Sequence, residues 1–241
     1  LMPNTGTLSG LSASTAYALD AVHVDAFGNV SSVVSSAAFI TDVAPPTSIL
    51  FQGAGDLGTG TSATIAGGIT TSGFHVLCLF NDDPSIGQAT VTLNGVAPDG
   101  AVSSQDTFGG NVEIHYIAAA TPGDIVVTTG DVSRAKSYAL YRLDGFTAAG
   151  LISDEAEDQG PITLSAVPDG AAMIIAAGAA AGSSPGLPVI TAPGTTEDGG
   201  HTDFPSLTVN SGTQSGSGDV TASFTGGANR FGLAGIAFPV A

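Results

Sequence analysis

The sequence predicts an all-β protein whose main part is an antiparallel, jelly-roll-like β-sandwich. Short runs rich in β-branched and aromatic residues recur along the chain, and turn signals such as "APDG", "TPGD" and "VPDG" separate them. Glycine (34 residues) and proline (13 residues) are too frequent to leave room for long helices. These observations favour many short strands joined by tight turns.

Twelve strands are expected in a sandwich domain that spans residues 47–241, at 48–53, 61–66, 73–80, 88–94, 111–118, 124–129, 137–143, 161–167, 171–178, 206–210, 217–224 and 231–238. Residues 220–224 (VTASF) alternate between apolar and polar side chains, which predicts a sheet with one solvated face. Residues 171–182 (AAMIIAAGAAAG) are apolar on both faces, which predicts either a central strand covered on both sides or a strand at an interface. No repeat of fixed period is visible in the sequence, so a single sandwich is expected.

The first 41 residues carry a separate pattern. Side chains alternate in polarity after Tyr17, the run "DAFGN" at 25–29 has turn chemistry, and a second β-branched run follows at 30–41. This pattern predicts one β-hairpin. Residues 42–46 form a linker that Pro45 and Pro46 stiffen toward an extended conformation.

This segment resembles the second half of a fibronectin type III module. The pattern L-x-G-L-x-x-x-T-x-Y and the later D-x-x-G-N are carried by Leu8, Gly10, Leu11, Thr15, Tyr17, Asp25, Gly28 and Asn29. The resemblance implies that Tyr17 is a buried corner tyrosine whose hydroxyl bonds nearby backbone. Residues 1–41 would then be the C-terminal part of such a module. We expect either that the chain belongs to a longer polypeptide, as Leu1 favours, or that a partner supplies the missing strands.

The charge is strongly negative, with four Lys and Arg residues against 21 Asp and Glu residues and a net charge of −17. Such a surface repels nucleic-acid phosphates and anionic membranes, so we expect no nucleic-acid partner. The longest apolar stretch, at 171–182, is too short to cross a bilayer, and no membrane insertion is expected. The acidity serves solubility or the binding of divalent cations, and both alternatives stay open.

Three acidic stretches contain candidate calcium ligands, because calcium takes six to eight oxygen ligands. The first candidate site consists of Asp154, Glu155, Glu157 and Asp158, expected in one loop. The other two stretches hold Asn81, Asp82 and Asp83, and Glu197, Asp198 and Asp203. None has EF-hand spacing, and a solvated loop is the alternative for each. Apart from calcium, no cofactor is expected.

No catalytic residue is assigned, and a non-enzymatic protein is expected. The sequence lacks a G-x-S-x-G elbow, and its four histidines (His23, His75, His115 and His201) lack zinc-type spacing. Cys78, the single cysteine, is expected to be a small buried hydrophobe. There is no tryptophan to form a sugar platform; Tyr116, Tyr138 and Tyr141 could replace it, or they could belong to the core.

Two stretches, 124–146 and 167–182, together with the late "FGLAGIAFPV", resemble sandwich domains of tailed-phage virion proteins. The resemblance implies a virion surface protein: a tail fibre, a receptor-binding protein or a head decoration that contacts the host surface. Its partners would be other virion subunits in a homo-oligomer and a host glycan or receptor. The alternative is a carbohydrate-binding or adhesive module of a secreted or cell-surface bacterial protein. The long connections at 178–186 and 191–200 are expected to carry recognition.

Overall fold

The computed structural model describes most of the chain from Pro46 onward and short pieces before it. The described residues are 16–17, 20–21, 24, 27–32, 34–35, 39–40, 46–81, 88–105, 110–129, 135–157, 160–179, 188–201, 206–225 and 231–241. The chain divides into two compact units, Leu1–Pro45 and Pro46–Ala241. Every regular element in the described residues is a β-strand, which confirms the all-β class.

The first unit shows nested antiparallel pairing. β1 (Ala16–Tyr17) pairs with β4 (Phe39–Ile40), β2 (Asp20–Ala21) pairs with β3 (Val34–Ser35), and Val24 bridges Val30. Gly28 lies inside the innermost bridge with a φ of 85°, a conformation that glycine adopts without strain. The side chain of Tyr17 is outside the described part of the structure, so its role as a corner tyrosine stays a prediction.

The second unit contains sixteen described strands in four antiparallel sheets. In the first half these are β5 (Ser48–Thr59), β6 (Ser62–Ile69), β7 (Gly73–Asn81), β8 (Thr90–Leu93), β9 (Gly100–Gln105), β10 (Asn111–Ala120), β11 (Gly123–Thr128) and β12 (Ala135–Asp144). In the second half they are β13 (Ile152–Glu157), β14 (Ile162–Val167), β15 (Ala172–Ala179), β16 (Val189–Thr191), β17 (Thr196–His201), β18 (Ser206–Thr213), β19 (Gly218–Thr225) and β20 (Phe231–Phe238).

The two halves have the same topology, so the expected single sandwich is in fact two. The first half orders its strands as β5-β12-β7-β10-β9 and β6-β11-β8, and the second as β13-β20-β15-β18-β17 and β14-β19-β16. Counted from the first strand of each half, both orders read 1-8-3-6-5 and 2-7-4. The repeat is hidden in the sequence because the two halves use different residues for the same strands.

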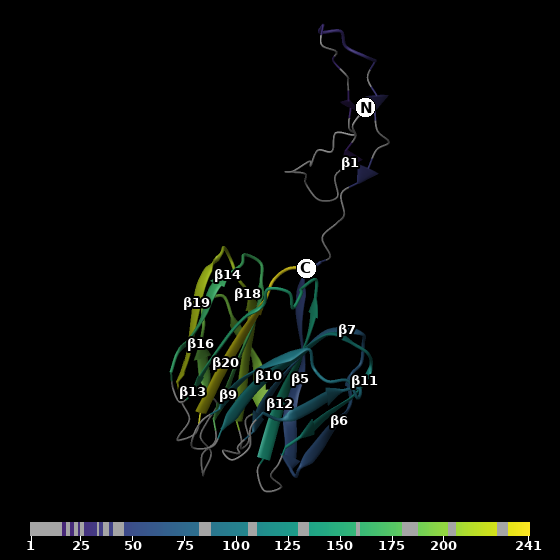
Figure 1. Cartoon of the computed structure of the whole chain (residues 1–241). Helices are drawn as coiled ribbons and strands as arrows, with labels where there is room; N and C mark the ends of the chain where they lie inside the picture. The colour runs from purple at the N-terminus through teal and green to yellow at the C-terminus, as the bar shows by residue number, and fades with distance from the viewer. Residues whose placement is uncertain are drawn as a thin grey trace. The chain divides into compact units, whose positions relative to one another are not determined.

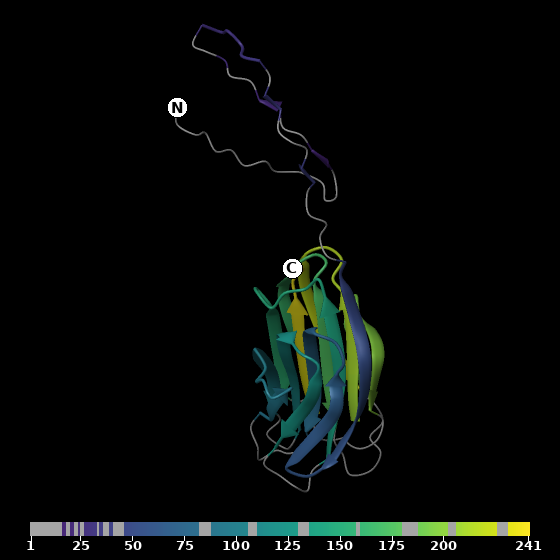
Figure 2. The ribbon, with the colours of Figure 1, turned by 90° about the vertical axis from the view of Figure 1, so that its right-hand side faces the viewer.

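The four sheets are stacked in four layers, and four apolar clusters lie between them (Figures 1 and 2). One cluster lies between the two sheets of the first half, and two lie between the sheets of the second half. The largest cluster joins the two five-stranded sheets face to face. Central strand β15 is therefore buried on both faces, as its sequence predicts: Ile174 and Ala176 face the first half, whereas Ile175 and Ala177 face β14 and β19.

The contacts between the halves are reciprocal. The first strand of each half contacts the fifth strand of the other, since β5 contacts β17 and β13 contacts β9. Likewise, β10 contacts β20 and β12 contacts β18, so the halves are related by an approximate two-fold axis. Large side chains of the first half, such as Phe80, lie against small Ala and Gly residues of the second half, such as Gly178. These small residues let the two sheets approach closely.

A Gly-Asp pair at the start of the seventh strand repeats in both halves. Asp124 Oδ1 accepts a hydrogen bond from the N–H of Gly67 at 2.8 Å, and Asp219 Oδ1 accepts one from the N–H of Ala166 at 2.8 Å. Both donors lie at a β-bulge with positive φ, 58° for Gly67 and 55° for Ala166. The carboxylate therefore holds the same bulge in each sandwich.

We expect Ala166→Gly to raise the free energy of unfolding by about 1 kcal/mol, because glycine adopts this conformation without a clash at Cβ. Gly67→Ala is expected to lower it by about the same amount. Its new Cβ would meet no atom within 4 Å, so backbone strain alone is measured. Urea unfolding followed by circular dichroism measures both variants. A change of the same sign in the two variants would contradict the prediction.

Candidate functional site

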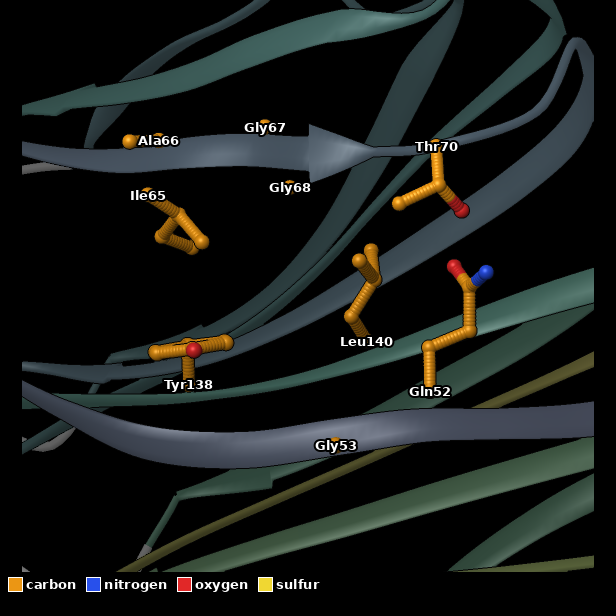
Figure 3. A pocket seen from close by; sticks show the side chains of 9 residues that line it. All are labelled: Gln52, Gly53, Ile65, Ala66, Gly67, Gly68, Thr70, Tyr138 and Leu140. Carbon is orange, nitrogen blue, oxygen red and sulfur yellow. The ribbon is translucent and has the colours of Figure 1, made fainter.

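A pocket of about 370 Å³ opens at the edge of the first sandwich, and we call it the Tyr138 pocket. Three strands that are distant in sequence line it: β5, β6 and β12. The lining residues are Gln52, Gly53, Ile65, Ala66, Gly67, Gly68, Thr70, Tyr138 and Leu140. Tyr138 and Ile65 lie toward one end, Gln52 and Thr70 lie toward the other, and Leu140 lies between them (Figure 3).

Glycines create the space for this pocket. Tyr138 is paired in register with Gly55 of β5, and its ring lies across that glycine, 3.0 Å from the position that a Cβ would take. On β6, a side chain on Gly67 would point into open space. The pocket therefore combines a partly exposed aromatic side chain with exposed backbone.

Other side chains occupy the equivalent edge of the second sandwich. There, Ile162 and Leu164 of β14 fill the space over Gly235 of β20. The Asp154 carboxylate of β13 also accepts a hydrogen bond from the N–H of Thr163 in β14, with Oδ2 at 2.6 Å. Since the two halves share one topology, the pocket arises from the side chains of the first half and not from the fold.

Among the described residues that line the Tyr138 pocket, the Tyr138 phenol is the one ionisable group. Its polar side chains are the amide of Gln52, the hydroxyl of Thr70 and the phenol of Tyr138. The chain as a whole carries a net charge of −17, so its composition does not explain why the pocket lining is uncharged. This lining suits a neutral ligand that offers hydrogen-bonding groups and an apolar face.

Gln52, which lines the pocket, also belongs to a polar cluster around His75, a fully buried residue of β7. His75 Nε2 lies 2.9 Å from the carbonyl oxygen of Thr71, and Nδ1 lies 3.2 Å from Oε1 of Gln52. Arg142 donates to the Asp144 carboxylate and to the Thr71 hydroxyl, each at 3.0 Å. Burial is the largest influence on His75 and lowers its pKa, whereas the hydrogen bond to the Thr71 carbonyl raises it.

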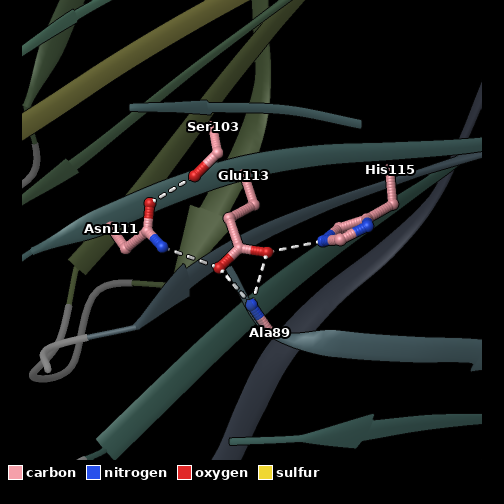
Figure 4. A network of polar contacts seen from close by, with 5 residues as sticks. All are labelled: Ala89, Ser103, Asn111, Glu113 and His115. Carbon is pink, nitrogen blue, oxygen red and sulfur yellow. Dashed lines mark hydrogen bonds and ion pairs between the residues drawn. The ribbon is translucent and has the colours of Figure 1, made fainter. Parts of the chain in front are cut away.

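A second polar network is buried inside the first sandwich (Figure 4). The carboxylate of Glu113, with no exposed surface, accepts hydrogen bonds from the backbone N–H of Ala89 at 2.9 and 3.1 Å. It also accepts one from Asn111 Nδ2 at 2.9 Å and contacts His115 Nε2 at 2.6 Å. Ser103 donates to Asn111 Oδ1 at 2.7 Å. The network ties the start of β8 to β10.

The acidic stretch proposed for calcium is a strand and not a loop. Residues 152–157 form β13, in which neighbouring side chains point to opposite faces, so Asp154 and Glu155 diverge. Asp154 bonds the backbone of Thr163 and Glu155. The Glu157 side chain and Asp158 are outside the described residues. Within the part that is described, no group of three or more His, Cys, Asp or Glu side chains could hold a metal, and calcium binding stays a prediction.

Another candidate ligand, Asp198, also lies in a strand. Residues 196–201 form β17, so the expected long connection at 191–200 is much shorter than predicted. Asp198 accepts a hydrogen bond from the Tyr141 hydroxyl at 3.0 Å and thereby links the two halves. The residues 82–87, 180–187 and 202–205, which include Asp82, Asp83 and Asp203, are outside the described part.

The three candidate tyrosines have different environments. Tyr141 is fully buried, and its ring lies tilted against that of Phe51 with 5.4 Å between the ring centroids. Tyr116 packs on Phe74 and Phe238 in the core between the halves. Tyr138 alone of the three lines a described pocket. Cys78 is buried in the same core as Tyr141, as predicted, and burial raises the pKa of its thiol.

Comparison with protein-family models, with curated proteins and with solved structures gave no match. Among the residues that the structure describes, there is no helix with the length and apolar character needed to cross a membrane. The function has to be inferred from the geometry and chemistry of the sites.

Proposed function

We propose that the chain is a non-enzymatic attachment protein of a virion surface, of the tail-fibre or decoration type, that binds a neutral host glycan in the Tyr138 pocket. The observation that carries this proposal is the uncharged pocket with an aromatic side chain at one end and the Gln52 amide and Thr70 hydroxyl at the other. Sugars offer C–H groups to the electron-rich face of an aromatic ring and hydroxyls to polar side chains.

The architecture supports a display role. Each half is proposed to be a jelly roll, because eight strands divide between its two sheets in the order 1-8-3-6-5 and 2-7-4. The broad apolar interface between the halves supports a rigid unit, and the proposed fibronectin type III segment supports its use as a tethered module. Other virion subunits, in a homo-oligomer, are the proposed partners.

The polar networks support a binding role over catalysis. The partners of His75 are an amide and a backbone carbonyl, and the partner of His115 is a carboxylate. None of these groups is a nucleophile for acyl transfer. The contacts of the Glu113 carboxylate with Ala89, Asn111 and His115 support a structural role for it.

The alternative is an adhesive module of a secreted or cell-surface bacterial protein, and it uses the same pocket. Its support is also the pocket, since a single tyrosine platform suits a carbohydrate-binding module. The assembly state separates the two: a virion component is expected to form a symmetric homo-oligomer, whereas an adhesive module is expected to be monomeric. Size-exclusion chromatography with light scattering measures this.

We expect Tyr138→Ala to weaken glycan binding by about 1.5 kcal/mol, or roughly tenfold, because the stacking surface is lost. Tyr138→Phe keeps the ring and is expected to bind within about threefold of the original chain. A glycan array identifies the ligand, and calorimetry measures the affinities. Thr221→Ala, at an exposed position of β19 in the other sandwich, is the control and is expected to leave the affinity unchanged. Equal binding by Tyr138→Ala and the original chain, with the fold intact, would refute the assignment of the pocket.

A further inference from the structure

Gln52 lies between the Tyr138 pocket and the buried imidazole of His75. It lines the pocket, and its Oε1 lies 3.2 Å from His75 Nδ1. The second ring nitrogen, Nε2, lies 2.9 Å from the Thr71 carbonyl oxygen. A ring buried on every side and held at both nitrogens cannot turn to change its partners.

The protonation of His75 fixes the direction of the Gln52 contact. A carbonyl oxygen only accepts hydrogen bonds, so Nε2 carries a proton in either state of the ring. In the neutral ring Nδ1 is therefore an acceptor, and Gln52 must offer its NH₂ group to it. In the imidazolium Nδ1 is a donor, and Gln52 must offer its oxygen, which is the orientation that the structure shows. The two ends of an amide are similar in shape, so this reversal needs only a rotation of the terminal group.

We propose that His75 is a positioning residue that decides which end of the Gln52 amide faces a ligand in the Tyr138 pocket. This inference rests on the proposed glycan-binding function. Beside a neutral His75, the amide oxygen faces the pocket and accepts a hydrogen bond from the ligand. Beside a protonated His75, the NH₂ group faces the pocket and donates one.

The reversal distinguishes two classes of sugar. The N–H of an acetamido sugar can only donate, so it loses its partner when Gln52 turns its NH₂ group to the pocket. A sugar hydroxyl can donate or accept, and it keeps a partner in both states. The pocket is thus expected to bind acetamido sugars in a pH-dependent manner and plain sugars in a pH-independent manner.

The surroundings of His75 place the change on the acid side of neutrality. Burial is the largest influence and lowers the pKa below 6.5. The Thr71 carbonyl raises it, Arg142 lowers it, and Asp144 and the backbone of Tyr141 raise it. Arg142 and Asp144, both on β12, form an ion pair at 2.8 Å and are the charged groups near the ring, while Ile117 of β10 lies opposite His75 in register. The lowered pKa favours the neutral ring at pH 7, and in that state Gln52 is rotated relative to the structure, with its NH₂ group toward Nδ1.

The test measures binding of N-acetylglucosamine and of glucose at pH 7.5 and at a pH below the His75 titration midpoint, which NMR of the ring provides. We expect N-acetylglucosamine to bind about tenfold more weakly at the lower pH, the effect of one lost hydrogen bond, and glucose to change less than about twofold. His75→Asn keeps an amide near the position of Nδ1 without titrating, and it is expected to abolish the pH dependence. His201→Asn, in β17 of the second sandwich, is the histidine control.

A second measurement does not depend on any ligand. In the original chain, the side-chain NH₂ resonances of Gln52 are expected to shift with the same midpoint as the His75 ring. If neither sugar binds at either pH but this coupled titration is seen, the proposed function fails and the positioning role stands. Gln52 resonances that do not respond while His75 titrates, or a pH dependence that persists in His75→Asn, would overturn the proposal.

Discussion

Replacing Glu113 by alanine is expected to lower the free energy of unfolding by about 4 kcal/mol. The carboxylate is fully buried and receives hydrogen bonds from Ala89 and Asn111 in addition to its contact with His115. Alanine would leave these groups buried without a partner, and it would leave a cavity. Removing one member of a buried charged network costs about 3–5 kcal/mol for this reason.

Urea unfolding followed by circular dichroism measures the change, since the chain has no tryptophan. Glu113→Gln keeps the shape and part of the hydrogen bonding, and it is expected to fall between the original chain and the alanine variant. Glu155→Ala is the matched control, because Glu155 is exposed on β13, and its effect is expected to stay within about 0.5 kcal/mol. A loss of less than about 1 kcal/mol in Glu113→Ala would show that the network contributes little to the stability of the fold.

The strands that the sequence predicts are mainly the interior ones. All twelve expected strands exist, with ends that differ by a few residues. The four strands that were not predicted, β9, β13, β16 and β17, each lie at the edge of a sheet. Edge strands need few apolar residues and often carry charge and glycine, as "ISDEAE" and "TEDGGH" do, so they lack the pattern of a half-buried strand.

The duplication was invisible for a related reason. The two halves satisfy one topology with different side chains, for example aromatic residues in β7 and small residues in β15. The repeated signal in the sequence is the Gly-Asp pair at 123–124 and 218–219, which holds a bulge in each half. A pair of residues is too short to indicate a repeat until the strands are placed.

The candidate site could be predicted only in its residue types. Tyr138 was one of three tyrosines considered as a platform, but Gln52, Gly67 and Thr70 come from other strands, and no local pattern links them. The Glu113 network had a signal, because Asn111, Glu113 and His115 alternate in "NVEIH". That alternation normally indicates a solvated face, whereas the structure covers it with the start of β8.

The interface between the halves gives the second large prediction, at Gly178 of β15. A methyl group there would overlap the ring of Phe80 from β7, which is fully buried and cannot move aside. Gly→Ala at an unobstructed strand position stabilises a protein by up to about 1 kcal/mol, so any loss of stability in this variant would come from the clash. We expect Gly178→Ala to lower the free energy of unfolding by about 3 kcal/mol, as overpacking of a tight core does.

A double-mutant cycle tests whether Phe80 is the cause. Phe80→Leu alone is expected to lower the free energy of unfolding by about 1.5 kcal/mol through lost packing. In the double variant the smaller leucine makes room for the new methyl group, so the combined loss is expected to be about 2 kcal/mol and not the sum of the two. Losses that add within about 0.5 kcal/mol would mean that Gly178 and Phe80 do not touch. Because these residues belong to opposite halves, the predicted coupling can arise only if the two five-stranded sheets are packed face to face in solution.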